Sequence, residues 1–315
     1  MVRICSLLPS ATEIVCALGL QDDLVAITHE CDYPPGLEIT PRITSSVVDS
    51  DSLGSRDIDN AIKLALDNLS TIYRLDRDRL AELQPDLILT QELCEVCAVS
   101  FAEVEACARE ICPGADVVSL EPDSLAGILG TIQTVGGRAG VTARADTLLK
   151  ELKNRLDQVE ARARRATRRP RVLALEWLDP LFIGGHWVPE MVDLAGGIDV
   201  LGFPGTRSRV ITWTDVVDAN ADIIVLMPCG FDLARTVAEF HAVATSDEWM
   251  RLPAARAGQV FAVDGSAYFN RPGPRVVDGV EILAGILQPD IFGPASAHQV
   301  QQVLAESTRL APRGA

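Results

Sequence analysis

Two cysteines three positions apart, Cys94 and Cys97, follow the apolar stretch DLILT at residues 86–90. Thiols at this spacing can form a redox couple, supply half of a metal site or line a ligand pocket. A thioredoxin-type couple needs its first thiol at a helix N-terminus within a fold that the surrounding sequence does not predict. Zinc takes four ligands, so a metal site would need further partners from other parts of the chain.

Such partners follow other predicted strands. Cys31 comes after the stretch LVAITHE, and Cys229 comes after DIIVLMP. The carboxyl ends of parallel strands lie at one edge of a sheet, where ligands bind. We therefore expect Cys31, Cys94 and Cys97 to converge. They would bind zinc or cobalt, contact a soft metal carried by a ligand, or line a pocket as unreactive thiols.

Aromatic side chains gather on the same class of loops, although aromatic residues make up only 5% of the chain. Rings on loops, rather than in helical stripes, predict a large, flat and partly apolar ligand; for a single ring, a core position beneath a loop is the alternative. The rings expected to enclose the ligand are Tyr33, Trp177, Phe182, Trp187, Trp213, Tyr268 and Phe269. The other side chains expected to contact it are Glu30, Cys31, Glu92, Cys94, Cys97, His186, Cys229 and Arg271.

The elements that would carry these loops alternate between strands and helices, which is typical of parallel sheets covered by helices. Residues 140–168 differ, because they contain no proline, have no glycine after position 140 and place leucines on one face. They predict one amphipathic helix of about 40 Å. The predicted fold is α/β, with two Rossmann-like lobes of central parallel sheets joined by this long α-helix and a ligand cleft between the lobes. The predicted boundaries are 1–138, 139–169 and 170–315.

Local patterns add detail at the N-terminus. Ser10 and Glu13 match an S-x-x-E capping box, which predicts a helix that ends near Gly19. Pro9 and Glu13 interrupt the apolar stretch, which argues against a signal peptide, and no apolar run predicts a membrane span. We therefore expect a cytoplasmic protein with its eight cysteines reduced, or a periplasmic or extracellular one if the chain is a processed form.

The net charge and the sequence motifs argue against several classes of function. The net charge of −16 should repel nucleic acid and anionic lipid. The chain contains no nucleophile elbow, Walker loop or dinucleotide fingerprint, so an enzyme is not expected. We expect a non-enzymatic protein that binds a small molecule, acts as a monomer and requires no cofactor.

The order of several motifs resembles one known family. The stretches LLPSATEIVCALG, THECDYPP, LAELQPDLILT, FIGGHWVPEMVDLAGG and TWTDVVDANADIIVL, together with the long helix, are similar to class III substrate-binding proteins of ABC importers. The similarity covers residues 2–290 and is greatest to the cobalamin-binding members. It implies two lobes joined by a long helix, with cobalamin or a related corrinoid or tetrapyrrole bound between them.

The resemblance also implies roles for individual residues. Tyr33, Phe182 and the pair Tyr268–Phe269 match pocket aromatics of the cobalamin binders. Asp78 and Asp215 match the regions whose carboxylates dock on an ABC permease, where the cobalamin binders use glutamate. The alternatives are a metal-trafficking protein that uses the thiolates of Cys31, Cys94 and Cys97, a ferric-siderophore binder that uses arginines, and an enzyme that reuses the cleft. The arginines in question are Arg207, Arg209, Arg271 and Arg275.

Overall fold

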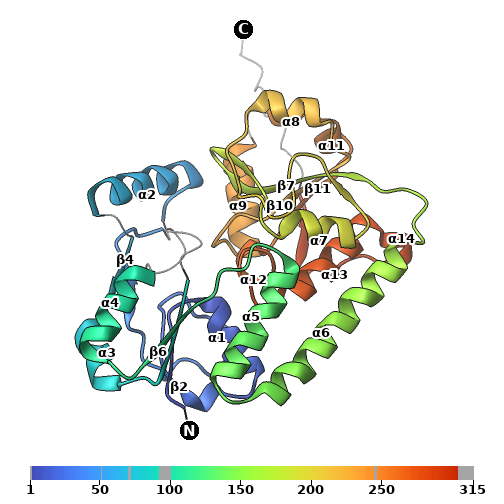
Figure 1. The fold of residues 1–315 in the computed structure, drawn as a ribbon. Helices are drawn as coiled ribbons and strands as arrows, with labels where there is room; N and C mark the ends of the chain where they lie inside the picture. The colour runs from blue at the N-terminus through green and yellow to red at the C-terminus, as the bar shows by residue number, and fades with distance from the viewer. Residues whose placement is uncertain (1, 51, 70–71, 92–100, 245–246, 304–315) are drawn as a thin grey trace. The chain divides into compact units, whose positions relative to one another are not determined.

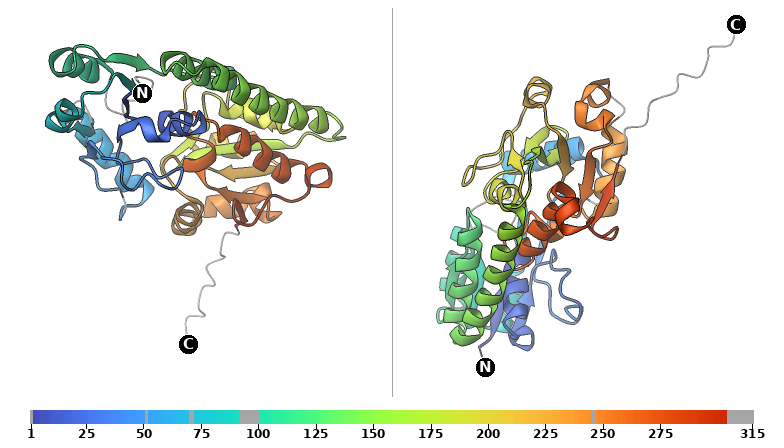
Figure 2. Two further views of the ribbon diagram at one scale, coloured as in Figure 1. Left: turned by 90° about the horizontal axis from the view of Figure 1, so that it is seen from below. Right: turned by 90° about the vertical axis from the view of Figure 1, so that its right-hand side faces the viewer.

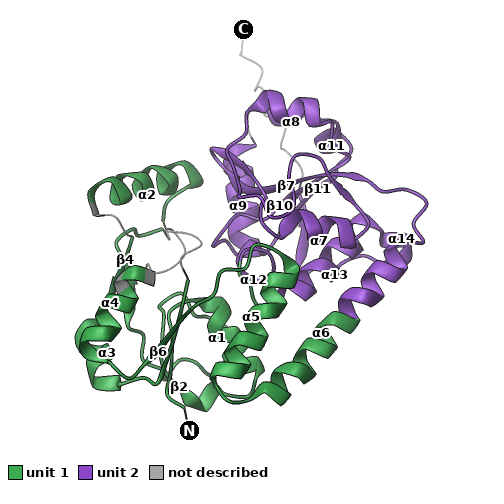
Figure 3. Cartoon of the chain, in the orientation of Figure 1, with its two compact units in different colours: residues 1–154, 271–274 green, residues 155–270, 275–315 purple. Residues whose placement is uncertain are grey.

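A computed structural model describes residues 2–50, 52–69, 72–91, 101–244 and 247–303 of the chain. The chain divides into two compact units (Figure 3). Unit 1 comprises residues 1–154 and 271–274, and unit 2 comprises residues 155–270 and 275–315. The chain therefore passes between the units three times. The first passage lies inside the long helix, which the sequence-based division had treated as a separate linker.

Unit 1 is built on a parallel sheet with strand order β2-β1-β5-β6 (Figure 1). The predicted strands are present but shorter than expected, at β1 (Ile4–Ser6), β2 (Leu24–Ile27), β5 (Leu87–Thr90) and β6 (Asp116–Ser119). The helices are α1 (Pro9–Ala17), α2 (Ser55–Leu69), α3 (Arg77–Leu83), α4 (Phe101–Ile111) and α5 (Leu125–Arg138). A two-stranded antiparallel ribbon, β3 (Thr44–Ser46) with β4 (Tyr73–Leu75), was not predicted.

Helices cover both faces of this sheet because successive strand side chains point to opposite sides. Cys5 of β1 and Ile88 of β5 pack in one buried cluster with Leu80 of α3 and Val104 of α4. The other face is covered by α1 and α5, which contact each other (Figures 1 and 2). On that face Ser6 accepts a hydrogen bond from the Thr12 hydroxyl of α1 at 2.8 Å. The layered α/β prediction is confirmed for unit 1.

The predicted capping box at the start of α1 is wrong. The N-cap residue is Leu8, which makes no side-chain cap, and Pro9 occupies the first turn. Proline suits that position because its missing N–H would have no intrahelical partner. Ser10 and Glu13 are both buried instead. Gly19, as predicted, lies just beyond the helix, with a φ of 71° that a residue with a side chain rarely adopts.

Unit 2 is built on a mixed sheet with strand order β12-β11-β10-β7-β8, in which β9 also pairs with β7. Its strands are β7 (Arg171–Leu178), β8 (Leu181–Ile183), β9 (Ile198–Asp199), β10 (Ile223–Leu226), β11 (Val260–Val263) and β12 (Val300–Gln302). The strands β7, β9, β10 and β11 are parallel, and β8 and β12 are antiparallel edges. The predicted parallel centre is confirmed, whereas the antiparallel edge strands were not expected.

The helices of unit 2 again lie on both faces of its sheet. They are α7 (Val188–Leu194), α8 (Trp213–Ala219), α9 (Leu233–Val243), α10 (Asp247–Arg251), α11 (Pro253–Arg256), α12 (Gly265–Tyr268), α13 (Val276–Leu287) and α14 (Pro289–Phe292). Residues from α8, α9 and α10 form one buried cluster with the strands. Helices α7 and α13 contact each other and lie outside that cluster (Figure 1).

The long helix α6 runs over Thr142–Ala163. It is shorter than predicted because the chain turns at Arg164 and Arg165. The predicted apolar stripe is confirmed, since Leu149, Leu152 and Val159 are buried. Among the described residues, no helix combines the length and the apolar character needed to cross a membrane.

Each unit contains the same arginine anchor at the start of an inner strand of its sheet. In unit 1 the Arg3 side chain donates to the carbonyls of Leu83 and Gln84, and its backbone N–H donates to Asp86 at 2.8 Å. Gln84 ends α3 in a left-handed conformation. The equivalents in unit 2 are Arg171, Ala219, Asn220 and Asp222, and that backbone bond is also 2.8 Å. The two units therefore share this pattern of individual hydrogen bonds.

Candidate functional site

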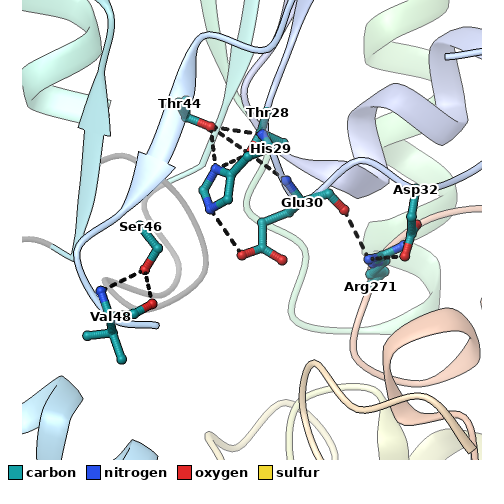
Figure 4. A network of polar contacts seen from close by, with 8 residues as sticks. All are labelled: Thr28, His29, Glu30, Asp32, Thr44, Ser46, Val48 and Arg271. Atoms are coloured by element: carbon teal, nitrogen blue, oxygen red, sulfur yellow. Dashed lines mark hydrogen bonds and ion pairs between the residues drawn. The ribbon is translucent and has the colours of Figure 1, made fainter. Parts of the chain in front are cut away.

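A polar network follows β2 in unit 1 (Figure 4). The Thr44 hydroxyl of β3 donates to Thr28 Oγ1 at 2.8 Å and lies 2.7 Å from Nδ1 of His29. His29 Nε2 faces Glu30 Oε1 at 3.3 Å. The hydrogen bond with His29 lowers the pKa of Glu30, although burial opposes this shift.

The next residue, Cys31, lies beneath this loop rather than on its surface. Its sulfur is 3.0 Å from Thr12 Oγ1, and the side chain is buried. Burial raises the pKa of the Cys31 thiol to about 11, so it stays protonated at neutral pH. Metal ions bind the thiolate, which makes Cys31 a poor ligand in this conformation.

The predicted convergence of three thiols concerns residues that are only partly described. Cys94, Cys97 and Glu92 lie outside the described residues. Within the parts of the chain that the structure does describe, no group of three or more histidine, cysteine or acidic residues could hold a metal ion. The zinc or cobalt site therefore stays a prediction.

Tyr33 projects from the same loop, and 43% of its surface is exposed. It precedes Pro34 through a cis peptide bond. Tyr33 and Glu30, whose side chain is 44% exposed, are the predicted contacts on this loop that a ligand can reach. These two predicted contacts therefore lie on one loop at the carboxyl end of the unit 1 sheet.

In unit 2, aromatic and cationic side chains stack at the ends of β7 and β10. The half-buried Trp177 ring lies 5.2 Å from the ring of Phe231, and the Arg235 guanidinium lies 4.0 Å above Phe231. Phe182 of β8 is paired with Trp177 across the strands and is also half-buried. The structure thus brings the predicted Trp177 and Phe182 together. It adds Phe231 and Arg235, which were not among the predicted contacts.

Glu176 is another residue that the sequence did not single out. Its Oε2 accepts hydrogen bonds from Gly185 N–H at 3.2 Å and from the Ser208 hydroxyl at 2.8 Å. His186, which follows Gly185, has a φ of 53°, and its N–H donates to Thr206 O at 2.7 Å. Glu176 therefore holds the segment GGHW against the loop around residues 205–208. Burial raises the pKa of Glu176, although both hydrogen bonds oppose this shift.

Replacing Glu176 by glutamine should change how stability depends on pH. The pKa of Glu176 in the folded protein lies above its ordinary value of 4.5, so the folded state binds more protons than the unfolded state between these two values. The contribution of Glu176 to stability should therefore fall as pH rises through this window, and Glu176→Gln should lack this loss, so its stability should fall less, or rise more, than that of the wild type. Urea unfolding at pH 4 and at pH 8 measures the difference.

Ser208→Ala is the matched control for this prediction. It removes a donor that favours the charged carboxylate, so its stability should fall more steeply with pH than that of the wild type. Identical pH dependence in all three proteins would contradict the assignment.

Several predicted rings lie in the core of unit 2. Phe269 has no exposed surface, and its carbonyl accepts a 2.7 Å hydrogen bond from Nε1 of the buried Trp187. Trp213 packs edge-on against the buried Trp249 at 5.3 Å. A ligand could reach Phe269 or Trp187 only if the surrounding chain moved, so we correct the expectation that these rings enclose it. Tyr268 is half-buried, with the Arg275 guanidinium 5.7 Å from its ring centre.

Among the six described cysteines only Cys229 is exposed. Burial raises the pKa of Cys16 to about 12, and Cys5, Cys31, Cys107 and Cys112 are buried. A thiol reacts as its thiolate, so Cys229 should react with a maleimide fastest in this set. Mass spectrometry of the folded protein, with Cys94→Ser and Cys97→Ser as background, measures each rate. Labelling of Cys31 as fast as Cys229 would contradict this expectation.

The two carboxylates expected to dock on a permease occupy different positions on equivalent helices. Asp78 is exposed in the first turn of α3. Asp215 lies one position later in the first turn of α8, where its Oδ2 accepts from both the N–H and the hydroxyl of Thr212 at 2.8 Å. These hydrogen bonds from Thr212 lower the pKa of Asp215, which keeps it ionised. Asp215 therefore carries the negative charge that the predicted role requires.

The fold and the loops can now be compared with known proteins. The family model described as "Periplasmic binding protein" matches residues 4–267. This chain belongs to that family. The predicted resemblance is therefore confirmed, and the chain is a substrate-binding protein of the type that serves ABC importers.

Individual relatives are distant but cover most of the chain. An uncharacterized ABC transporter substrate-binding lipoprotein of Bacillus subtilis, YvrC, is 24% identical over 92% of this chain and 81% of its own length. A vitamin B12-binding protein of Vibrio cholerae is 22% identical over 89% of this chain and 86% of its own length. These relatives are named as binding proteins, not as enzymes.

Solved structures show the same fold. The apo periplasmic heme-binding protein RhuT from Roseiflexus sp. RS-1 has a TM-score of 0.67 and 22% identity, and covers 91% of this chain and 97% of its own. The vitamin B12-binding protein BtuF of Vibrio cholerae has a TM-score of 0.64 and 21% identity, and covers 91% of this chain and 96% of its own. The predicted α/β fold of two lobes is therefore confirmed.

Proposed function

We propose that this periplasmic binding protein captures a corrinoid or a related tetrapyrrole and delivers it to an ABC permease. The observation that carries the proposal is the set of reachable rings at the carboxyl ends of the parallel strands: Tyr33 in unit 1, and Trp177 with Phe182 in unit 2. Flat macrocycles bind through stacking on such rings. Relatives named as vitamin B12-binding and heme-binding proteins support this ligand class.

Titration with cyanocobalamin and with haemin, followed by visible absorbance and calorimetry, tests the proposal. We expect one of them to bind with a Kd below about 10 μM, which corresponds to roughly 7 kcal/mol of binding free energy. Tyr33→Ala and Trp177→Ala should each weaken binding about tenfold or more, because each removes a stacking surface. Phe292→Leu alters a ring that contacts Arg162 at α14 and serves as the control.

The outcome of this titration also separates the alternatives. If neither macrocycle binds at tens of micromolar, the proposed ligand class is wrong. Binding of a ferric siderophore would then support the siderophore alternative, and near-stoichiometric zinc or cobalt in the purified protein would support the metal-trafficking alternative. The expected cleft between the lobes stays a prediction.

Delivery to a permease implies a location outside the cytoplasm, which we propose in place of the cytoplasmic expectation. The words "lipoprotein" and "periplasmic" in the names of relatives support this location. The partner would bind through Asp78 and Asp215. Asp78→Lys with Asp215→Lys should abolish stimulation of the permease ATPase while leaving ligand affinity unchanged. Full stimulation by the double variant would exclude these docking carboxylates.

A further inference from the structure

A short segment, Arg271–Pro274, belongs to unit 1, although the residues on both sides of it belong to unit 2. The Gly273 N–H donates to the Arg271 carbonyl at 2.8 Å, which closes a tight turn. The turn lies against the start of α1, because a Cβ atom on Gly273 would be 3.5 Å from both the Cα and the carbonyl oxygen of Ser10. The chain therefore makes a compact contact with unit 1 before it continues into α13.

One side chain attaches this turn to the loop after β2 (Figure 4). The Arg271 guanidinium pairs with both carboxylate oxygens of Asp32, and its Nη2 lies 3.1 Å from Asp32 Oδ2. Nη2 also donates to the carbonyl of Glu30 at 3.2 Å. Two parallel bonds from a guanidinium to a carboxylate are stronger and more directional than a single ion pair. Arg271 thus contacts the loop at two points, Glu30 and Asp32.

A buried carboxylate lies on the other side of the same guanidinium. Glu13 of α1 is only 3% exposed, and its Oε1 is 3.7 Å from Arg271 Nη1. A carboxylate removed from water needs a nearby positive charge, which Arg271 supplies. Burial alone would lower the pKa of Arg271, but Asp32 and Glu13 more than offset it, so this pKa is raised. The arginine stays charged between the two carboxylates.

This arrangement assigns Arg271 a different role from the predicted ligand contact. Both terminal nitrogens are engaged by Asp32, Glu30 and Glu13, and only 12% of the side chain is exposed. We propose that Arg271 is a positioning residue that anchors the turn 271–274 on unit 1 and holds the loop 29–33 in its binding conformation. The effect of Arg271 on ligand binding rests on the proposed function, since Glu30 and Tyr33 on this loop would face the ligand. The anchoring itself does not depend on any ligand.

Hydrogen exchange of Asp32→Asn tests the anchor without ligand. Asp32 is 65% exposed, so the variant should fold. Loss of the Asp32 charge weakens its paired hydrogen bonds to Arg271. Hydrogen exchange at the amides of residues 29–33 and of Gly273 should therefore become about tenfold faster, while the amides of α6 keep their exchange rates. The control is Glu110→Gln, which disrupts the exposed ion pair with Arg77 elsewhere in unit 1 and should change neither region.

Arg271→Lys provides a second variant, because lysine keeps a charge near Glu13 but cannot form two parallel hydrogen bonds to the Asp32 carboxylate. It should also speed exchange in the loop, and it should weaken cyanocobalamin or haemin binding about fivefold or more without altering the spectrum of the bound ligand. An altered spectrum would indicate direct contact and overturn the positioning role. Unchanged loop exchange in both variants would overturn the anchor. Failure of the wild type to bind either ligand would count against the proposed function alone.

Discussion

Replacing Trp249 by alanine should lower the free energy of unfolding by about 3–5 kcal/mol. Trp249 is 1% exposed and lies in the buried cluster beneath α8 and α9. It contacts two rings edge-on, Trp213 and Phe240, each at a centroid distance of 5.3 Å. Truncation would remove both contacts and leave a cavity that the surrounding strands cannot fill without moving. Urea unfolding followed by far-UV circular dichroism measures the loss.

Trp213→Phe is the matched control for this change. Trp213 is half-buried at the edge of the same cluster, and phenylalanine keeps an aromatic ring there, so the cost should stay below about 1.5 kcal/mol. If Trp213→Phe costs as much as Trp249→Ala, the assignment of Trp249 as the central ring is wrong.

Replacing Gly185 by alanine should destabilise unit 2 by about 3 kcal/mol, at the upper end of what overpacking costs. A Cβ atom on Gly185 would lie 2.3 Å from Ser208 N and 2.7 Å from Thr206 O. Both are backbone atoms, which cannot rotate out of the way. The loop around Ser208 must therefore move, and it would pull its hydroxyl from Glu176. Differential scanning calorimetry should show a lower melting temperature.

Gly130→Ala makes the same chemical change where there is room. Nothing lies within 4 Å of a Cβ atom on Gly130, which sits inside α5. Alanine should stabilise that helix by up to about 1 kcal/mol, because glycine is the more flexible residue. If Gly185→Ala matches Gly130→Ala in stability, the close approach of the two loops in unit 2 does not exist in solution.

Local patterns in the sequence were sufficient to predict the layered α/β architecture. Apolar runs such as DLILT, and the leucine stripe of α6, depend on neighbours two to four residues away, and these short-range preferences act alike in any fold. The family resemblance worked for the same reason, since its motifs are short and occur in a fixed order. The capping box failed because the helix begins at Pro9, which places Ser10 inside the first turn rather than at the N-cap.

Contacts between residues far apart in the chain determined whether each aromatic ring or charged side chain is buried or exposed. The buried Trp187 donates its indole N–H to the carbonyl of Phe269, 82 positions away. Arg271 is held by Asp32 at a separation of 239 positions. No periodicity encodes such pairs, because they follow from how strands and helices stack. The sequence therefore predicted that rings and charges would gather after the strands, and the folded chain determined which of them stay within reach of a ligand.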